Sequence, residues 1–169
     1  VLSAARRAVL RRLRRRAFVC VVSGRALADV RARIGLPSVA AIGNHGLEIA
    51  CGARRWRHPG AEAARGELGQ ALAAIRRRLP RCPGLLVEDK GLTGSVHVRR
   101  VRRSLWPEVE AVVRDEVGRR RTALRLTKGH CVYEVRPRLA WNKGLGVRSL
   151  LASLETGARV HEFRSRAAT

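Results

Sequence analysis

Apolar residues follow two different spacings along the first part of this chain. Every third or fourth residue is apolar over residues 2–16 and again over residues 26–34, which predicts two helices. Residues 17–22 and 39–42 are instead unbroken apolar runs, typical of strands buried on both faces. A buried strand, a turn, a helix and a second buried strand predict a right-handed βαβ unit, in which the two strands are parallel neighbours.

The middle of the chain has a different spacing of apolar and polar residues. A small hairpin over residues 47–57 precedes a helix, marked by Leu68 and Leu79, that ends at Pro80. Beyond it, polar and apolar residues alternate over residues 95–101, which predicts a half-buried strand paired antiparallel with residues 85–88.

A further helix and a second hairpin are predicted after these strands. Residues 105–117 have helical spacing, and residues 124–136 alternate around Lys128-Gly129, which predicts a second hairpin. A last helix is expected over residues 142–154, with Asn142 as its N-cap. A hairpin, helix, hairpin module therefore follows the βαβ unit, and we expect one α/β module inserted into another.

Composition adds a strong positive charge. The sequence has 36 Lys and Arg against 13 Asp and Glu, a net charge of +23, which predicts attraction to polyanions or phosphorylated ligands. The apolar fraction of 46% is enough for a folded core. A nucleic-acid-binding protein is one candidate. Against it, the arginines are spread along the whole chain, aromatic residues make up only 4%, and no nucleic-acid-binding motif occurs.

The cysteines and the absence of long apolar segments bear on the compartment. Cys20, Cys51, Cys82 and Cys131 form no Cys-x-x-Cys pair, so we expect reduced thiols in a cytoplasmic protein. No apolar window is long enough for a transmembrane helix, and no signal peptide is expected. Because residue 1 is Val1, the chain has either an alternative start or is a piece of a longer protein.

Polar segments follow both predicted parallel strands. Ser23-Gly24-Arg25 and Gly43-Asn44-His45-Gly46 lie at their carboxyl ends, where ligands bind in open α/β sheets. A serine hydroxyl and the free N–H groups before a helix can hold a phosphate group. Taken alone, each segment is also typical of an ordinary turn.

These segments are the first of five motifs that occur in order. The others are Val87-Glu88-Asp89-Lys90-Gly91, Glu134-Val135-Arg136-Pro137 and Asn142-Lys143-Gly144, and Gly46 continues into Leu47-Glu48-Ile49. Over residues 18–154 the chain therefore resembles the trehalose-6-phosphate phosphatases of the haloacid dehalogenase superfamily. The resemblance implies an α/β fold, a partial Rossmann-like haloacid dehalogenase core with an inserted α+β cap domain. The expected boundaries are residues 1–82 and 139–169 for the core and 83–138 for the cap.

The resemblance also assigns roles in the core. Ser23 matches the serine that hydrogen-bonds the transferring phosphoryl group, and Lys143 matches the lysine that neutralises charge on the phosphate and the nucleophile. These two are the expected catalytic residues. The expected binding residues on the core are Gly24, Arg25, Asn44, His45 and Gly46.

On the cap, four charged residues match positions that such phosphatases use to hold the trehalose hydroxyls, namely Glu88, Lys90, Arg99 and Glu134. His130 stands where many relatives place a lysine that contacts the sugar. Glu134 shares a predicted strand face with Val132 and Arg136.

Two features of the family are missing from this sequence. The nucleophilic aspartate and its acid/base partner belong to an Asp-x-Asp-Gly-Thr motif upstream of Ser23, yet residues 1–16 contain no Asp or Glu. The Asp-Asp pair that completes the Mg²⁺ site is absent from residues 160–166. Magnesium is expected for the family, but its carboxylate ligands are not present here. Truncation or a shifted reading frame would explain both ends.

Three functions follow from these observations. The first is hydrolysis of trehalose 6-phosphate to trehalose and phosphate in trehalose biosynthesis, by a fragment that is inactive as given. The second is a non-catalytic pseudo-phosphatase that binds sugar phosphates, and the third is the nucleic-acid binder above. We expect a small phosphorylated disaccharide as partner, no membrane contact, and self-association through an incomplete core.

Overall fold

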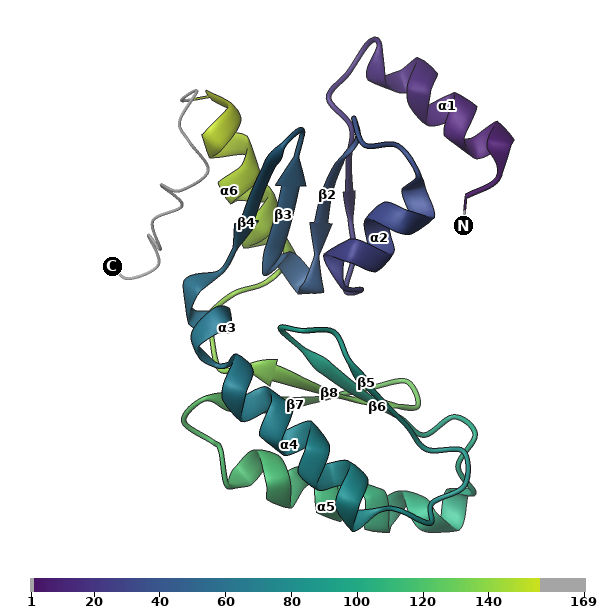
Figure 1. Cartoon of the computed structure of the whole chain (residues 1–169), viewed down its shortest axis with the longest axis vertical. Helices are drawn as coiled ribbons and strands as arrows, with labels where there is room; N and C mark the ends of the chain where they lie inside the picture. The colour runs from purple at the N-terminus through teal and green to yellow at the C-terminus, as the bar shows by residue number, and fades with distance from the viewer. Residues whose placement is uncertain (1, 156–169) are drawn as a thin grey trace. The chain divides into compact units, whose positions relative to one another are not determined.

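The computed structural model describes residues 2–155, which divide into two units (Figure 1). Unit 1 contains the described residues up to His58 and those from Ala140 onward. Unit 2 is the continuous segment Pro59–Leu139. One unit is therefore inserted into the chain of the other.

Unit 1 is built on a four-stranded sheet with the order β1-β2-β3-β4. The predicted parallel pair is present, because β1 (Cys20–Val22) pairs in parallel with β2 (Ala40–Gly43). The predicted small hairpin, β3 (Glu48–Cys51) and β4 (Arg54–Arg57), extends the same sheet in antiparallel fashion.

Alternate residues of β2 point to two different clusters of buried side chains. Ala41 packs with Val30 and Ile34 of α2 (Leu27–Ile34). Ala40 and Ile42 pack instead with Leu150 of α6 (Lys143–Glu155). The two helices therefore cover opposite faces of the sheet, and both faces of β2 are buried as predicted.

Strand β1 differs from the prediction of burial on both faces. It lies at the edge of the sheet, with β2 as its only neighbour in the described part of the chain. Val22 is 37% exposed and Phe18, just before the strand, is 53% exposed. An apolar run alone cannot distinguish a central strand from an edge strand, because both positions accept the same residues.

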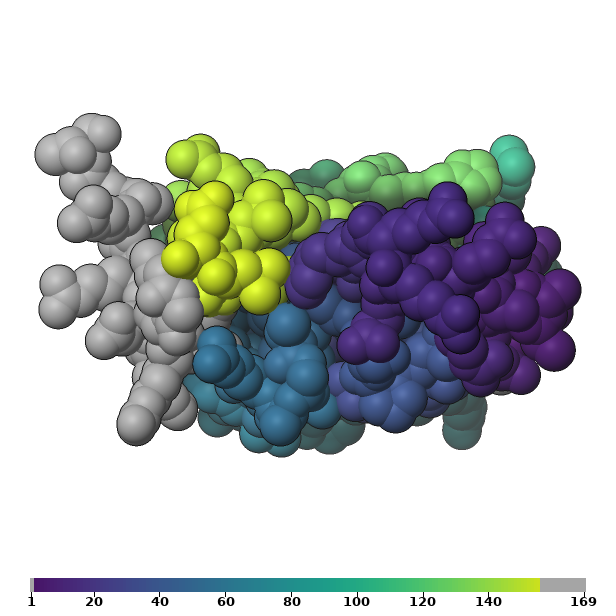
Figure 2. Space-filling model, turned by 90° about the horizontal axis from the view of Figure 1, so that it is seen from above, coloured from purple at the N-terminus to yellow at the C-terminus, as the bar shows by residue number. Residues whose placement is uncertain are grey.

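Helix α1 (Ala4–Arg14) forms as predicted but contributes little to the core. No residue of α1 is buried, and Val9 and Leu13 of its apolar stripe are 61% and 49% exposed. Figure 2 shows the N-terminal segment, coloured dark purple, on the visible surface of the molecule. No helix in the described part of the chain is long and apolar enough to cross a membrane.

Unit 2 contains a separate, wholly antiparallel sheet with the order β5-β6-β8-β7, as predicted. Its strands are β5 (Leu86–Asp89), β6 (Gly94–His97), β7 (Leu124–Gly129) and β8 (Val132–Pro137). Its helical segments are α3 (Pro59–Ala63), α4 (Arg65–Arg78), η2 (Arg103–Leu105) and α5 (Trp106–Gly118). The hairpin turn between β7 and β8 lies at His130 and Cys131, rather than at the predicted Lys128-Gly129.

The boundary between the units is not at residue 82, where the sequence analysis placed it. Residues 59–82 belong to unit 2, because Leu72 and Ile75 of α4 pack with Val96 and Val135 of its sheet. The amphipathic pattern of α4 predicts a buried face but does not say which of two sheets it covers. The predicted return of the chain to the core, at residue 139, lies beside the observed division at Ala140.

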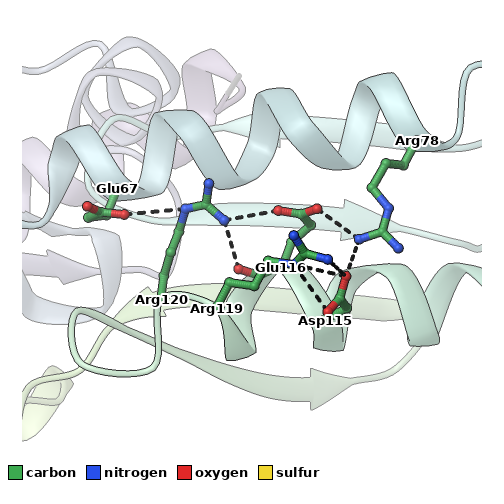
Figure 3. Close-up of polar contacts among 6 residues, drawn as sticks. All are labelled: Glu67, Arg78, Asp115, Glu116, Arg119 and Arg120. Carbon is green, nitrogen blue, oxygen red and sulfur yellow. Dashed lines mark hydrogen bonds and ion pairs between the residues drawn. The ribbon is translucent and has the colours of Figure 1, made fainter.

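A row of ion pairs also ties α4 to α5 (Figure 3). Arg78 of α4 contacts both Asp115 and Glu116 of α5, with 2.8 Å between Arg78 Nη1 and Glu116 Oε1. Arg120 bridges Glu116 and Glu67, at 3.0 and 3.3 Å. Glu116 is only 5% exposed, and although burial alone would raise its pKa, the hydrogen bonds from the two arginines lower it. The helices of unit 2 are thus joined by charge as well as by apolar contact.

Candidate functional site

The carboxyl end of β1 is a tight turn formed by Ser23, Gly24 and Arg25. The Ser23 N–H donates to the carbonyl of Ile42, so that the turn continues the pairing with β2. The Ser23 Oγ accepts from the Arg25 N–H at 3.1 Å. The serine hydroxyl is therefore half-buried and fixed at the point where the strand ends.

The end of β2 makes the second turn, η1 (Asn44–Gly46), which contacts the first one directly. The His45 N–H donates to the Ser23 carbonyl at 3.2 Å, and the Asn44 N–H donates to the Arg25 carbonyl at 2.7 Å. Both Asn44 and His45 have positive φ, at 46° and 58°. This backbone brings the His45 imidazole over Gly24, where a Cβ would lie only 2.6 Å from the ring.

The beginning of α6 closes the third side of the same region. Trp141 Nε1 donates to the Gly46 carbonyl at 2.9 Å, and a Cβ on Gly46 would lie 2.5 Å from the Asn142 carbonyl oxygen. Asn142 is the N-cap that the sequence predicts, because its Oδ1 accepts from the Leu145 N–H at 3.0 Å. Lys143, the first residue of α6, is exposed beside this contact.

The side chain of Asn44 has a role that the sequence does not reveal. It is 0% exposed, and its Nδ2 donates to Glu48 Oε2 at 2.6 Å. The same carboxylate oxygen accepts from the Leu27 N–H at 2.9 Å, at the start of α2. Asn44 therefore positions the turn from inside unit 1, and Glu48, present in the motif but given no role there, is its partner.

Arg25 lies at the surface and bonds along α2. Its Nη1 donates to Asp29 Oδ2 at 3.1 Å. Although burial would raise the pKa of Asp29, the hydrogen bonds from Arg33 and Arg25 lower it. The turns carry the Ser23 hydroxyl and the His45 imidazole, and Lys143 follows Asn142, which contacts the second turn. A hydroxyl, an imidazole and an ammonium are groups that can hold a phosphate group.

The donor set does not suit Mg²⁺, which binds through carboxylates and water. Within residues 2–155 no three His, Cys, Asp or Glu side chains gather in a group that could hold a metal ion. Residues 160–166, which stand where the family has its Asp-Asp pair, lie outside the described residues. The four cysteines are free thiols.

In unit 2, one face of the sheet carries the polar residues that the sequence singles out. Glu134 on β8 accepts from the Ser95 hydroxyl at 3.0 Å, and its Oε1 lies 3.6 Å from the Lys90 ammonium. The Lys90 and Glu134 side chains are only 9% and 18% exposed. Beside them, Glu88 Oε2 lies 3.0 Å from the Nε2 of His97.

Arg99 and His130 lie in two neighbouring turns at one end of this sheet. Each is exposed, and the turns are joined by a hydrogen bond from the Val98 N–H to the Cys131 carbonyl. The structure thus brings Glu88, Lys90 and Glu134 together on the sheet and leaves Arg99 and His130 at its rim.

Ser95 and His97 belong to this polar face, although the sequence analysis gave neither of them a site role. The alternation over residues 95–101 places them on the side away from the core, which is the only signal the sequence offers. Their partners depend on strand register: Ser95 lies opposite both Glu88 and Glu134.

Comparisons with known proteins give one consistent result. A family model described as trehalose-phosphatase matches residues 1–163. The trehalose-phosphate phosphatase of Mycobacterium marinum is 38% identical over 148 residues, which cover 87% of this chain and 37% of that protein. The trehalose-phosphate phosphatase of Mycobacterium tuberculosis is 41% identical over 136 residues, covering 80% and 34%. The chain thus spans about a third of the length of these curated relatives.

Solved structures with a similar fold agree. A trehalose-6-phosphate phosphatase related protein gives a TM-score of 0.78 at 20% identity, over 90% of this chain and 65% of that one. The C-terminal domain of the Candida albicans trehalose synthase regulatory protein gives 0.73 at 13% identity, over 98% and 65%. These likenesses confirm the predicted α/β fold class, in which an α+β unit is inserted into the chain of another α/β unit.

Proposed function

From the premise that the chain belongs to the trehalose-phosphatase family, we propose that its two sets of polar residues serve the hydrolysis of trehalose 6-phosphate to trehalose and phosphate. The activity of its family would then be that of a phosphoric monoester hydrolase in trehalose biosynthesis. Unit 1 would hold the phosphate, and unit 2, as the cap, would hold the sugar.

The observation that carries the proposal is the meeting of three segments in unit 1. The Ser23 carbonyl accepts a hydrogen bond from the His45 N–H, and Gly46 packs closely against Asn142, the residue before Lys143. A serine hydroxyl and a lysine ammonium placed there can stabilise negative charge on a transferring phosphoryl group. We propose these two as catalytic residues, with Arg25, His45 and the backbone of Gly24 and Gly46 binding the phosphorylated end of the substrate.

The polar face of unit 2 suits a carbohydrate. Sugar hydroxyls both donate and accept hydrogen bonds, and this face offers the carboxylates of Glu88 and Glu134 beside the ammonium of Lys90. We propose that these three residues bind trehalose hydroxyls, with Arg99 and His130 contacting the sugar from the rim. Asn44 supports the site by positioning its turn.

Hydrolysis in this family needs more than phosphate binding. The family resemblance implies a carboxylate nucleophile upstream of Ser23 and a Mg²⁺ ion. Residues 1–16 contain no Asp or Glu, and within residues 2–155 no three His, Cys, Asp or Glu side chains form a group that could hold a metal ion. We therefore propose that the 169-residue polypeptide binds trehalose 6-phosphate but does not turn it over. Ser23 and Lys143 can orient the phosphate and balance its charge, but neither supplies the missing nucleophile.

The main alternative is a sugar-phosphate-binding protein without turnover in any context. The intact polar face of unit 2 favours it, because that face requires no nucleophile. We further propose a cytoplasmic location, and self-association through the edge of β1, whose outer backbone groups have no sheet partner in the described part of the chain.

The decisive test measures phosphate release from trehalose 6-phosphate in the presence of Mg²⁺. We compare the 169-residue chain with a chain extended by an Asp-x-Asp-Gly-Thr strand and an Asp-Asp segment, and with Lys143→Ala in both. Release by the extended chain alone, abolished by Lys143→Ala, supports the proposal. Release by neither chain, with binding retained, supports the alternative. Release by the unextended chain would contradict its proposed inactivity.

A further inference from the structure

Two arginines face each other on the polar face of unit 2, and the function proposed above uses neither of them. Arg125 on β7 and Arg136 on β8 are directly opposite in the antiparallel register. Directly opposite side chains lie on the same face of a sheet, with Cβ atoms about 5 Å apart. Glu134 precedes Arg136 by two residues on β8, so that all three side chains leave the same face.

One donor of each guanidinium lacks an acceptor within residues 2–155. The Nε atoms of Arg125 and Arg136 are both buried from solvent without a hydrogen-bond acceptor in this part of the chain. Each residue as a whole keeps part of its surface exposed. An enclosed donor without an acceptor costs free energy in the unliganded protein, and a ligand that accepts its hydrogen bond recovers that cost.

The two like charges add a second cost. Like charges directly opposite each other on a sheet are destabilising. Burial and the neighbouring charge of Arg125 lower the pKa of Arg136, and Glu134 offsets this in part. The exposed surface of the chain offers many positions where an arginine has no such neighbour, so a pair held in register on a polar face indicates a binding role.

We propose that Arg125 and Arg136 together bind a phosphate dianion, either of a phosphate monoester or of inorganic phosphate. A dianion balances both guanidinium charges, whereas a carboxylate would leave one unbalanced. Phosphate oxygens also match the planar fork of arginine donors, and two forks can bracket one tetrahedral group. This site belongs to unit 2 and is additional to the phosphate position proposed at Ser23 and Lys143 of unit 1.

The test uses the 169-residue chain with two probes, inorganic phosphate and glucose 6-phosphate, titrated calorimetrically at constant ionic strength against chloride. The variants are Arg125→Gln and Arg136→Gln, and the matched control is Arg77→Gln, an exposed arginine on α4. Each site variant should weaken phosphate binding in unit 2 by at least about tenfold, since each removes charge-assisted hydrogen bonds. Arg77→Gln should leave it unchanged.

Lys143→Ala separates this site from the one in unit 1, because binding by the arginine pair should persist in that variant. Thermal unfolding gives an independent readout. Without phosphate, Arg125→Gln and Arg136→Gln should raise the unfolding temperature above that of Arg77→Gln, and added phosphate should stabilise each of them less than it stabilises Arg77→Gln.

Tighter binding of glucose 6-phosphate indicates that the ligand is a phosphate ester. Tighter binding of inorganic phosphate indicates the free ion. Either result supports the site if both arginines are required. Phosphate binding that is equal in the site variants and the control would overturn it. Binding lost only with Lys143→Ala would also overturn it while leaving the proposed hydrolysis intact, and so would the absence of any phosphate effect on the parent chain.

Discussion

The amide of Asn44 donates to the carboxylate of Glu48 over 2.6 Å, at a place where both side chains are buried. The same carboxylate oxygen also accepts the first N–H of α2, from Leu27. One acidic side chain therefore ties the turn after β2 to the helix after β1. The polar turns of unit 1 hold their shape through this group, although it lies beneath the surface that a substrate would reach.

Glu48→Ala should lower the free energy of unfolding by about 3 kcal/mol, because it removes a buried carboxylate that accepts from both the Asn44 amide and the Leu27 N–H. Urea denaturation measures this loss. Asp29→Ala is the control, since Asp29 pairs only with exposed arginines and its removal should cost less than about 1 kcal/mol. Equal losses in the two variants would contradict the role given to Glu48.

Gly46→Ala should destabilise unit 1 and displace the start of α6. The added Cβ would lie 2.5 Å from the Asn142 carbonyl oxygen, and φ at this residue is +100°, which non-glycine residues rarely adopt. We expect a loss of about 2 kcal/mol, together with weaker binding of trehalose 6-phosphate.

Gly69→Ala is the matched control for that change. Gly69 lies inside α4, and nothing stands within 4 Å of the Cβ it would gain, so alanine should stabilise the chain by about 0.5–1 kcal/mol. Thermal unfolding of both variants should therefore move in opposite directions. A stabilising Gly46→Ala would show that the contact with Asn142 is loose.

Unit 2 should lose stability in acid in a defined range. Hydrogen bonds from Lys128, Arg114 and Tyr133 lower the pKa of Glu110 from 4.5 to about 2. A carboxyl group with a lowered pKa stabilises the fold at pH above its unfolded value, and this contribution disappears as the pH falls through the folded value. The unfolding temperature should therefore decline from about pH 4.5 down to about pH 2.

In Glu110→Gln the unfolding temperature should fall less steeply as the pH is lowered, because the amide does not titrate. Comparing the slope of unfolding temperature against pH in the parent and the variant isolates the contribution of Glu110 from those of Asp115 and Glu116, whose pKa values are also lowered. Identical slopes would rule out the contribution assigned to Glu110.

Ser95→Ala should weaken trehalose 6-phosphate binding about three- to tenfold, because the Ser95 hydroxyl orients Glu134 by donating to it at 3.0 Å. Calorimetric titration of the 169-residue chain measures the affinity. Ser104→Ala, at an exposed serine in η2, is the control. An unchanged affinity in Ser95→Ala would show that Ser95 has no part in the proposed sugar binding.

The sequence predicts this fold well where spacing alone determines structure. Unbroken and alternating apolar runs distinguish the parallel pair of β1 and β2 from the antiparallel strands of unit 2, and Asn142 marks the start of α6. Apolar spacing does not predict which of the two units contains α4, because an amphipathic helix can cover either sheet.

The sequence predicts only those residues of the candidate site that belong to the motifs. The resemblance identifies Glu88, Lys90 and Glu134, which the structure brings onto one face. It does not reveal that the Asn44 side chain is buried on Glu48, since the positive φ of the turn decides where that side chain points. Nor does it show that Arg125 opposes Arg136, because strand register arises from pairing rather than from either strand alone.

The edge position of β1 gives the segment before Ser23 a distinctive dynamic behaviour. Only one side of this strand is held by a neighbour in the described part of the chain, so its local opening should require less free energy than the opening of β2, which is held on both sides. Amide hydrogen exchange should therefore be faster in residues 20–22 than in residues 40–42. Any segment that pairs with the outer side of β1 would slow this exchange and restrain the Ser23 hydroxyl, so that order at the turn proposed to bind phosphate depends on how completely the sheet is assembled.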